Sequence, residues 1–465
     1  MNNNSSNVFK AGIGYTIGNY MIKGLSFLTI PIFSRILSTD DYGLFNTYIA
    51  VESIMCSIVG LALHTSLKNA KYKFGDEYEK YISSVILLEI LSMFAWCIIG
   101  LVSADFIYSI IGFTPGIIVL LVIHCTCSSI LSIYNVHLSL TYSYKSYIGV
   151  AAFNAIFNVV LSIVLIYSLY ENKRYVGRVV GTVFPLIFVA IYIIYKAWKR
   201  QKPIVSKRFF SFGALYSLPL IPHAISQVIL NQFDRIMISR MVGNGEAGIY
   251  SFAYSIYSIV EVTKVSLDNI WAPWFYERYQ KEKYDEIKKK SSQYAAGMLI
   301  FTILVMLVSP EIIKFLGTEE YYDAIYIVIP ICAAGFFSFL YTLPAQVEYF
   351  MGKTIYIAIG TGTAAVLNII LNVIFIKRFG YIAAAYTTEL TYILYFAFHY
   401  LISKRLEKKG LFSVKCLLCV TIICIIASIV IVHILEYVVI RWSIALSIII
   451  ITCILLRNKI IKINK

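Results

Sequence analysis

Charged residues are scarce in this sequence. Only 14% of the 465 residues are Asp, Glu, Lys or Arg, whereas 59% are hydrophobic and the mean hydropathy is +0.76. A soluble domain carries about 25% charged residues, so a soluble fold is excluded. Apolar runs of about 20 residues, the length that crosses the ~30 Å core of a bilayer, follow one another from Val8 to Leu456. The chain is therefore predicted to be an all-α polytopic membrane protein.

Long polar loops and catalytic signatures are also missing. The breaks between the apolar runs are short, and the sequence contains no P-loop, no HExxH motif and no nucleophile elbow. Polymerases and acyltransferases of membrane polysaccharides usually carry a large outer loop or a soluble domain for acid and base chemistry. The chain is therefore predicted to be a transporter and not an enzyme. A membrane polysaccharide polymerase or transferase is the alternative from another class.

Cysteine spacing indicates no metal site. The nine cysteines lie in or beside apolar runs, and no set of His and Cys with zinc-like spacing accompanies them. Free cysteine packs as a small apolar side chain, so all nine are predicted to be packing residues. The six histidines are scattered and are predicted to be packing or interfacial residues. We expect no metal and no cofactor.

Fourteen membrane spans are predicted from the apolar runs. Prolines interrupt two of them, the seventh at Pro219 and Pro222 and the tenth at Pro330 and Pro344. The spans lie at about 11–34, 44–67, 82–104, 116–139, 147–169, 176–196, 212–239, 248–272, 292–310, 323–350, 354–376, 381–402, 413–435 and 439–456.

Lysine and arginine are unevenly distributed between the two sides of the membrane. With the N-terminus inside, most of the 40 basic residues fall in cytoplasmic segments, and Arg178 is among the few in outer segments. Both termini are therefore predicted to be cytoplasmic. This topology accounts for the net charge of +15, and no soluble basic domain is present that would bind nucleic acid.

An internal repeat organises the chain. The segment SRILSTDDYGLF returns 205 residues later as SRMVGNGEAGIY. A weaker echo pairs NVVLSIVLI with NIILNVIFI, followed by YVGRVVGT from Tyr175 and YIAAAYTT from Tyr381. The positions identical in the first pair include Ser34 and Ser239, Arg35 and Arg240, and Gly43 and Gly248. The spacing predicts two copies of a six-helix unit and a final helix pair.

The repeat sets the predicted domains and their orientation. An N-lobe is expected at 1–205, a C-lobe at 206–405 and two further helices at 406–465. Because six is even, both copies cross the membrane in the same direction and form a parallel repeat. In two-lobed transporters the substrate path lies between the repeats, so the first and seventh helices are expected to line it.

Two segments resemble a known family. LPLIPHAISQVILNQFDRIMISRMVGNGEAGIYSFAYSI, residues 218–256, and KGLSFLTIPIFSRILSTDDYGLFN, residues 23–46, are similar to the Wzx-type polysaccharide flippases. These belong to the multidrug/oligosaccharidyl-lipid/polysaccharide exporter superfamily, abbreviated MOP. The resemblance extends over the whole length and includes the count of twelve helices plus two. It implies a MATE-like fold of two six-helix lobes around a central cavity that opens alternately to each side.

The resemblance also implies a substrate. Such a flippase moves an undecaprenyl-pyrophosphate-linked oligosaccharide, an O-antigen or capsule repeat unit, from the cytoplasmic to the outer leaflet. A polysaccharide polymerase and a chain-length regulator are the protein partners that it implies. Two alternatives within the superfamily remain open, a multidrug extruder and a lipid II flippase.

Three cations lie within predicted spans. A charged side chain at the centre of a span costs about 2.5 to 3.5 kcal/mol, so it normally faces a cavity or a partner. Lys23, Arg235 and Lys264 are predicted to contact the pyrophosphate in a hydrated cavity. The alternative is a structural ion pair, of Arg235 with Asp234 or of Lys264 with Glu261 or Asp268, on one helical face. We favour the ion pair for Asp234 and the cavity for Lys23.

Acidic residues within spans are candidates for a gate or for ion coupling. Glu52, Asp234, Asp268 and Glu389 form this set, and a proton or sodium gradient is expected to drive transport. No ligand spacing identifies the ion. The four repeat-signature residues at the outer helix ends are predicted to be structural first and gating second, namely Arg35, Arg240, Gly43 and Gly248.

Overall fold

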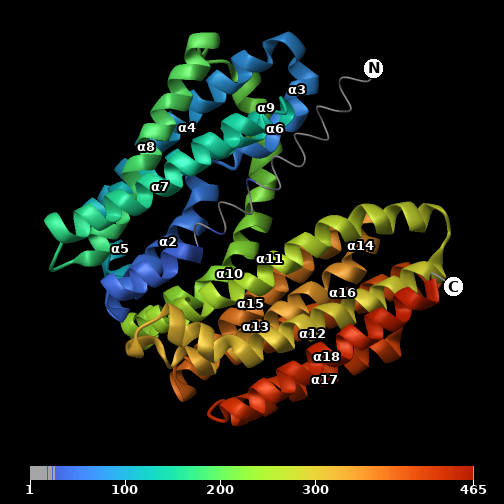
Figure 1. The fold of residues 1–465 in the computed structure, drawn as a ribbon. Coiled ribbons are helices and arrows are strands. Elements are labelled where there is room, and N and C mark those ends of the chain that lie inside the picture. The colour runs from blue at the N-terminus through green and yellow to red at the C-terminus, as the bar shows by residue number, and fades with distance from the viewer. Residues whose placement is uncertain (1–17, 19–23, 25–26, 464–465) are drawn as a thin grey trace. The chain divides into compact units, whose positions relative to one another are not determined.

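The computed structural model describes Gly18, Gly24 and residues 27–463, with side chains described as far as Ile454. Every regular element in this part of the chain is a helix, which confirms the all-α fold class. Contacts divide the chain into two compact units, Met1–Arg240 (unit 1) and Met241–Lys465 (unit 2). Figure 1 labels the helices of both.

The described part of unit 1 contains six long helices and several short ones. Helix α6 contacts α2, α4 and α8, and α7 pairs lengthwise with α8. The long helices are α2 (Thr39–Val59), α4 (Tyr78–Val102), α6 (Pro115–Leu140), α7 (Tyr144–Ser168), α8 (Arg174–Arg200) and α10 (Ile221–Met241). The labelled short ones are η1 (Leu63–Ser66), α3 (Leu67–Phe74), η2 (Gly75–Glu77), α5 (Ala104–Ile111), α9 (Lys207–Ser217) and η3 (Leu218–Leu220).

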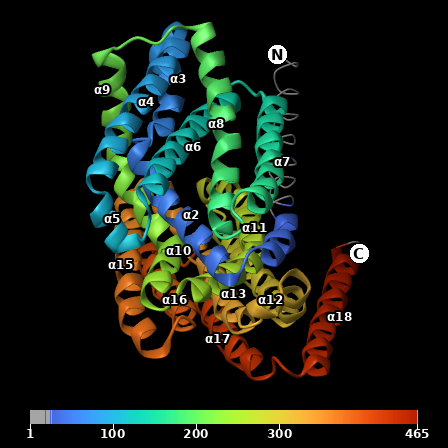
Figure 2. The same ribbon diagram turned by 90° about the vertical axis from the view of Figure 1, so that its left-hand side faces the viewer.

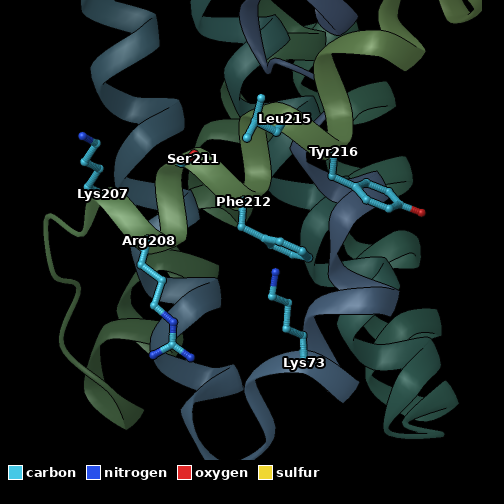
Figure 3. A pocket seen from close by; sticks show the side chains of 7 residues that line it. All are labelled: Lys73, Lys207, Arg208, Ser211, Phe212, Leu215 and Tyr216. Carbon is cyan, nitrogen blue, oxygen red and sulfur yellow. The ribbon is translucent and has the colours of Figure 1, made fainter.

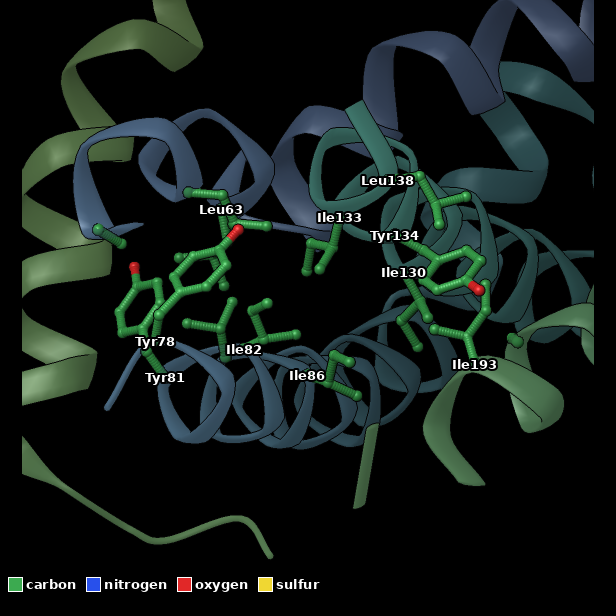
Figure 4. Close-up of a cluster of buried hydrophobic side chains, with 14 of the residues drawn as sticks. Leu63, Tyr78, Tyr81, Ile82, Ile86, Ile130, Ile133, Tyr134, Leu138 and Ile193 are labelled. Atoms are coloured by element: carbon green, nitrogen blue, oxygen red, sulfur yellow. The ribbon is translucent and has the colours of Figure 1, made fainter. Parts of the chain in front are cut away.

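A core of large apolar side chains holds unit 1 together at one end (Figure 4). Ile130 and Ile133 of α6 meet Ile86 of α4 in this core. The ring of Phe74 lies 5.0 Å from those of Tyr81 and Phe209, measured between centroids. Because Phe209 belongs to α9, the first part of the predicted seventh span packs within unit 1.

The second span ends earlier than predicted. It was expected to reach residue 67, whereas α2 ends at Val59. Leu61 and Ala62 have φ angles of 51° and 48°, in the left-handed region that stops an α-helix. The following helix α3 buries Leu67 and leaves Lys73 exposed, so it is amphipathic.

Unit 2 is built around α13 (Ala324–Leu340), which is buried along most of its length. Helix α13 contacts α11, α12, α16 and α17. Figure 2 shows α18 at the edge of unit 2, where it contacts α12. The remaining elements are α11 (Asn244–Gln280), α12 (Tyr284–Leu316), η4 (Glu319–Tyr321), α14 (Thr342–Phe350), α15 (Thr354–Phe379), α16 (Ala383–Leu406), α17 (Val414–His433) and α18 (Val438–Ile463).

The predicted spans match the observed helices. From the second to the fourteenth, each span coincides with one helix or with two consecutive helices, and ten of the described helical segments are long and apolar enough to cross a membrane. The seventh breaks at η3, which contains Pro219, as expected. The tenth breaks at Tyr341, whereas Pro330 lies inside α13. Most of the first span lies outside the described residues, and Phe27–Ile36 is helical.

Equivalent residues of the two repeats occupy equivalent places. Helix α2 begins at Thr39 and α11 begins at Asn244, 205 residues later. In unit 1 the Oδ1 atom of Asp41 accepts a hydrogen bond from the backbone N–H of Tyr175, at 3.0 Å.

The corresponding residues of unit 2 are also neighbours. The carboxylates of Asp323 and Glu246 both interact with the phenol of Tyr381, and Asp323 is its hydrogen-bond partner. Glu246 aligns with Asp41 in the first pair of similar segments, SRILSTDDYGLF and SRMVGNGEAGIY. Tyr381 aligns with Tyr175 in the continuation of the weaker echo, YVGRVVGT and YIAAAYTT. The predicted lobes at 1–205, 206–405 and 406–465 rest on this repeat and stay a prediction.

Candidate functional site

A polar pocket of about 320 Å³ lies inside unit 1, between the helix Phe27–Ile36 and helices α6, α7 and α8. Among the described residues that line the pocket, Arg178 of α8 is the cation, and Asn135, Asn154 and Asn158 contribute amide side chains. The side-chain oxygen of Asn154 is buried and has no hydrogen-bond partner among the described residues. A pocket with one cation and several amides suits a ligand that is both anionic and rich in hydroxyl groups.

Neutral groups orient Arg178. Its Nη1 atom donates to Ser162 Oγ at 2.8 Å and to Asn158 Oδ1. The Cζ atom lies 3.7 Å from the ring centroid of Phe33 and 4.8 Å from that of Phe45, within cation–π distance. Because these partners carry no charge, they fix the guanidinium without neutralising it.

Close packing of α7 against α8 creates this arrangement. A Cβ atom added at Gly181 would lie 2.4 Å from the Cα atom of Ser162, so a larger residue would force the helices apart. The glycine sits one turn beyond Arg178 on α8. Arg178 was counted with the outer segments in the predicted topology, and in the structure it lies near the start of α8, the helix of the sixth span. The signal that could have found it is its position in YVGRVVGT, the continuation of the second repeat echo.

Helices α15 and α16 of unit 2 correspond to α7 and α8 of unit 1 and also carry polar side chains, but they lack a cation at the position of Arg178. Asn368 Nδ2 donates to Thr388 Oγ1 at 3.2 Å, and Asn372 Nδ2 donates to Asn368 Oδ1 at 3.1 Å. In the second echo Asn368 aligns with Asn158 and Asn372 with Ser162. Ala384 stands where unit 1 has Arg178, so of these two aligned positions only the one in unit 1 is charged.

The predicted charged face of α11 points at α13 and α14. Lys264 Nζ donates to Ser338 Oγ at 2.6 Å, and Thr342 Oγ1 donates to Asp268 Oδ1 at 2.6 Å. Glu261, one turn before Lys264, is exposed. The structure therefore gives Lys264 and Asp268 each a hydroxyl partner on a neighbouring helix. Their functional roles stay predictions.

Two acidic residues of unit 1 meet adjacent serines of α6. Ser128 Oγ donates to Glu52 at 2.9 Å, and Ser129 Oγ donates to Glu89 at 2.6 Å. Glu89 is fully buried, and its Oε2 atom has no hydrogen-bond partner in the described part of the chain. Glu52 is one of the predicted gate or ion-coupling residues, whereas Glu89 was not predicted as a site residue. Glu389, the candidate on α16, is also buried.

An acid and a histidine form a buried pair in unit 2. Glu348 Oε1 lies 2.8 Å from His399 Nδ1, and both side chains have no exposed surface. The second polar atoms, Glu348 Oε2 and His399 Nε2, have no hydrogen-bond partner within the described residues. His399, predicted to be a packing or interfacial residue, is packed in the interior of unit 2, and the prediction did not include its contact with Glu348. No sequence signal links two residues on different helices, so their contact could not be predicted.

A family model described as polysaccharide biosynthesis protein matches residues 8–278, more than half of the chain. The protein belongs to this polysaccharide biosynthesis family. It is 24% identical over 344 residues to the Lsg locus putative protein 1 of Haemophilus influenzae, across 68% of this chain and 79% of that one. The resemblance to the Wzx-type polysaccharide flippases is confirmed.

Solved structures share the fold of this polysaccharide biosynthesis protein. It aligns with the lipid II flippase MurJ in an inward closed conformation, at a TM-score of 0.74 and 18% identity, over 96% of this chain and 100% of that chain. It also aligns with an inward-facing multidrug resistance MATE family transporter of the MOP superfamily, at a TM-score of 0.65 and 14% identity, over 83% of this chain and 96% of that chain. These proteins are transporters, and the predicted MATE-like transporter fold is confirmed.

The remaining predicted site residues of the polysaccharide biosynthesis protein lie on and before α10. Asp234 and Arg235 are both buried, and Arg235 Nη1 donates to Asn231 O at 3.0 Å and to Gln232 Oε1. The guanidinium therefore bonds back along its own helix. Lys23 lies outside the described residues. The proposed contact of these cations with pyrophosphate stays a prediction.

The repeat-signature residues have structural contacts. Arg35 Nη1 donates to Pro31 O at 2.8 Å. Arg240 Nη2 would lie 2.8 Å from a Cβ atom on Gly112, whose φ of +69° marks the end of α5. Gly43 and Gly248 are buried in the first turns of α2 and α11. A gating role for these residues stays a prediction.

Proposed function

We propose that this protein is a flippase that moves an undecaprenyl-pyrophosphate-linked oligosaccharide by alternating access. The cargo is an O-antigen or capsule repeat unit, and it passes from the cytoplasmic to the outer leaflet of a bacterial inner membrane, with both termini cytoplasmic. Family membership and fold support a transporter of this class. The observation that carries the substrate assignment is Arg178, an arginine held by neutral partners at an amide-lined pocket.

The chemistry of the pocket fits such a cargo. A pyrophosphate loses hydration when it enters a low-dielectric interior, and a guanidinium replaces that water with directed, charge-assisted hydrogen bonds. Amides both donate and accept, as sugar hydroxyl groups require. Asn154 contributes an acceptor that no described group uses. Lys23, Arg235 and Lys264 are proposed as further pyrophosphate contacts.

Translocation is tested in proteoliposomes that contain an undecaprenyl-pyrophosphate oligosaccharide, scored by the access of an external enzyme to the sugar. We expect Arg178→Ala to reduce the rate at least tenfold and Arg178→Lys to restore part of it, because lysine keeps the charge but lacks the planar fork. Lys173→Ala is the control, since Lys173 is exposed just before α8. An unchanged rate in Arg178→Ala would remove the pocket from the transport path.

The same assay separates the alternatives. A multidrug extruder would move cationic drugs and leave every lipid-linked sugar in place. A lipid II flippase would move lipid II and discriminate against other oligosaccharides. If the proposed substrate is correct, a polysaccharide polymerase and a chain-length regulator are the protein partners that act on the delivered product.

We also propose that an ion gradient drives the cycle, with the proton as the ion. The pair of Glu348 and His399 supports this choice, because two ionisable side chains are fully buried there and lie 2.8 Å apart, and ionisable residues inside a membrane are typical of proton pathways. Glu52, Asp234, Asp268 and Glu389 are the other proposed coupling or gating positions. Vesicles with an imposed pH gradient test the pair. We expect Glu348→Gln to transport equally with and without the gradient, and retained gradient dependence would contradict the assignment.

A further inference from the structure

A second pocket, of about 690 Å³, lies between α3 and α9 of unit 1 (Figure 3). Its described lining includes three cations, Lys73 from α3 and Lys207 and Arg208 from α9, and no acidic residue. The charge distribution of the sequence predicts that this end of unit 1 is cytoplasmic. A positively charged pocket at a membrane surface favours the binding of an anion.

The cations are held in different ways. Lys73 Nζ lies 4.3 Å from the ring centroid of Phe212, and Figure 3 shows it pointing toward that ring from α3. Arg208 Nη1 lies 2.9 Å from Glu77 Oε2, which neutralises one of the three charges. The pocket therefore keeps an excess of positive charge, provided by the two lysines.

Helix α9 and the following η3 carry exposed apolar side chains beside these cations. Leu215 is 73% exposed, and Leu218 and Leu220, which follow in η3, are 45% and 41% exposed. Helix α3 is amphipathic, with Tyr72 exposed beside Lys73. Lysines and tyrosines at the ends of apolar helices are typical of the membrane interface. Cations next to exposed apolar side chains match a ligand with an anionic head and a hydrocarbon tail. A free anion would contact the cations but not the apolar side chains.

We propose that the pocket between α3 and α9 binds the phosphate headgroup of an anionic membrane phospholipid, with an acyl chain along the exposed apolar side chains of α9 and η3. The headgroup phosphate contacts Lys73 and Lys207, and Leu215 lies against the start of the acyl chain. This site is separate from the Arg178 pocket and does not depend on the proposed transport activity.

Native mass spectrometry of the full-length protein in detergent tests the site, with phosphatidylglycerol and phosphatidylcholine as probes. We expect preferential retention of phosphatidylglycerol. Lys73→Ala should weaken it about fivefold, the factor expected for one cation near an anionic surface, and Lys73→Ala/Lys207→Ala should weaken it further. Lys68→Ala is the matched control, because Lys68 is exposed on the same helix but does not line the pocket. An equal loss in Lys68→Ala would show diffuse attraction and overturn the site.

A second arm distinguishes a lipid from a free anion. Leu215→Ser should weaken phosphatidylglycerol binding, because it removes apolar contact with the acyl chain, and inorganic phosphate should compete poorly. Strong competition by inorganic phosphate together with no effect of Leu215→Ser would overturn the lipid assignment. Binding of a polyprenyl pyrophosphate without binding of phosphatidylglycerol would overturn the choice of a bilayer phospholipid. Unchanged thermal unfolding of each variant confirms that the fold is intact.

Discussion

Arg441 makes a buried link between α18 and α12, and its removal should destabilise unit 2. The side chain is 1% exposed. Its Nη1 and Nη2 atoms donate to the two carboxylate oxygens of Glu311, at 2.8 and 2.7 Å. Nη1 also donates to Leu307 O at 2.6 Å, and Nε donates to Leu435 O at 2.9 Å. One guanidinium therefore satisfies a carboxylate and two backbone carbonyls.

The expected magnitude follows from these contacts. Removing one partner of a buried ion pair costs about 3 to 5 kcal/mol, because the other charge is left without compensation. Glu311 is 33% exposed, so water can solvate part of its carboxylate. We therefore expect Arg441→Ala to lower the free energy of unfolding by about 2 to 3 kcal/mol. Arg441→Lys should lie between the alanine variant and the wild type, since lysine cannot form the bidentate pair.

The assay is unfolding of the purified protein in mixed micelles by titration with a denaturing detergent. Lys314→Ala is the control, because Lys314 is exposed on the same helix as Glu311. A double-mutant cycle with Glu311→Ala isolates the pairwise energy. A coupling energy near zero, or a lysine variant as stable as the wild type, would refute the argument from bidentate geometry.

Three further variants and one control variant test the packing described above by thermal unfolding. Gly181→Ala should cost about 1 to 3 kcal/mol by separating α7 from α8, whereas Gly149→Ala, where a Cβ atom meets nothing within 4 Å, should be neutral or stabilising. Glu89→Gln keeps an acceptor for Ser129 and should change stability by less than about 1 kcal/mol, so a larger loss would mean that the carboxylate itself is structural. Asn372→Ala leaves the buried Asn368 without one of its partners and should cost about 1 to 3 kcal/mol, and an unchanged melting temperature would show that water replaces the amide.

Hydropathy alone predicted most of the fold, because a bilayer dictates the length of each helix. The breaks were harder to predict. Pro219 coincides with an observed break, whereas Pro330 lies inside an intact helix. Inside a bundle, neighbouring groups can compensate for the hydrogen bond that proline removes. The turn at Leu61 and Ala62 has no proline or glycine at its left-handed positions, so the residue types at these positions did not predict the end of the helix.

The candidate site was less predictable than the fold. The depth of a charge within a span selected Asp234, Arg235 and Lys264, whose functional roles stay predictions. It missed Arg178, because a residue one turn from a helix end resembles an interfacial anchor. It also missed the contact of Glu348 with His399, because packing of α14 against α16 brings together residues 51 positions apart. Partner choice in a helical bundle depends on the rotation of each helix, and a sequence does not state that rotation.

The aligned polar pairs have a consequence for how this protein arose. Duplication of an ancestral half would have given both copies the same side chains at the positions of Arg178 and Ala384. In the present chain the two halves differ, and at this aligned pair only the first carries a cation. A chain made of two identical first halves would possess two such arginines, and one made of two second halves would possess neither. The pair of halves is therefore asymmetric in charge at the aligned position, although both helix pairs carry polar side chains at the positions of Asn158 and Ser162.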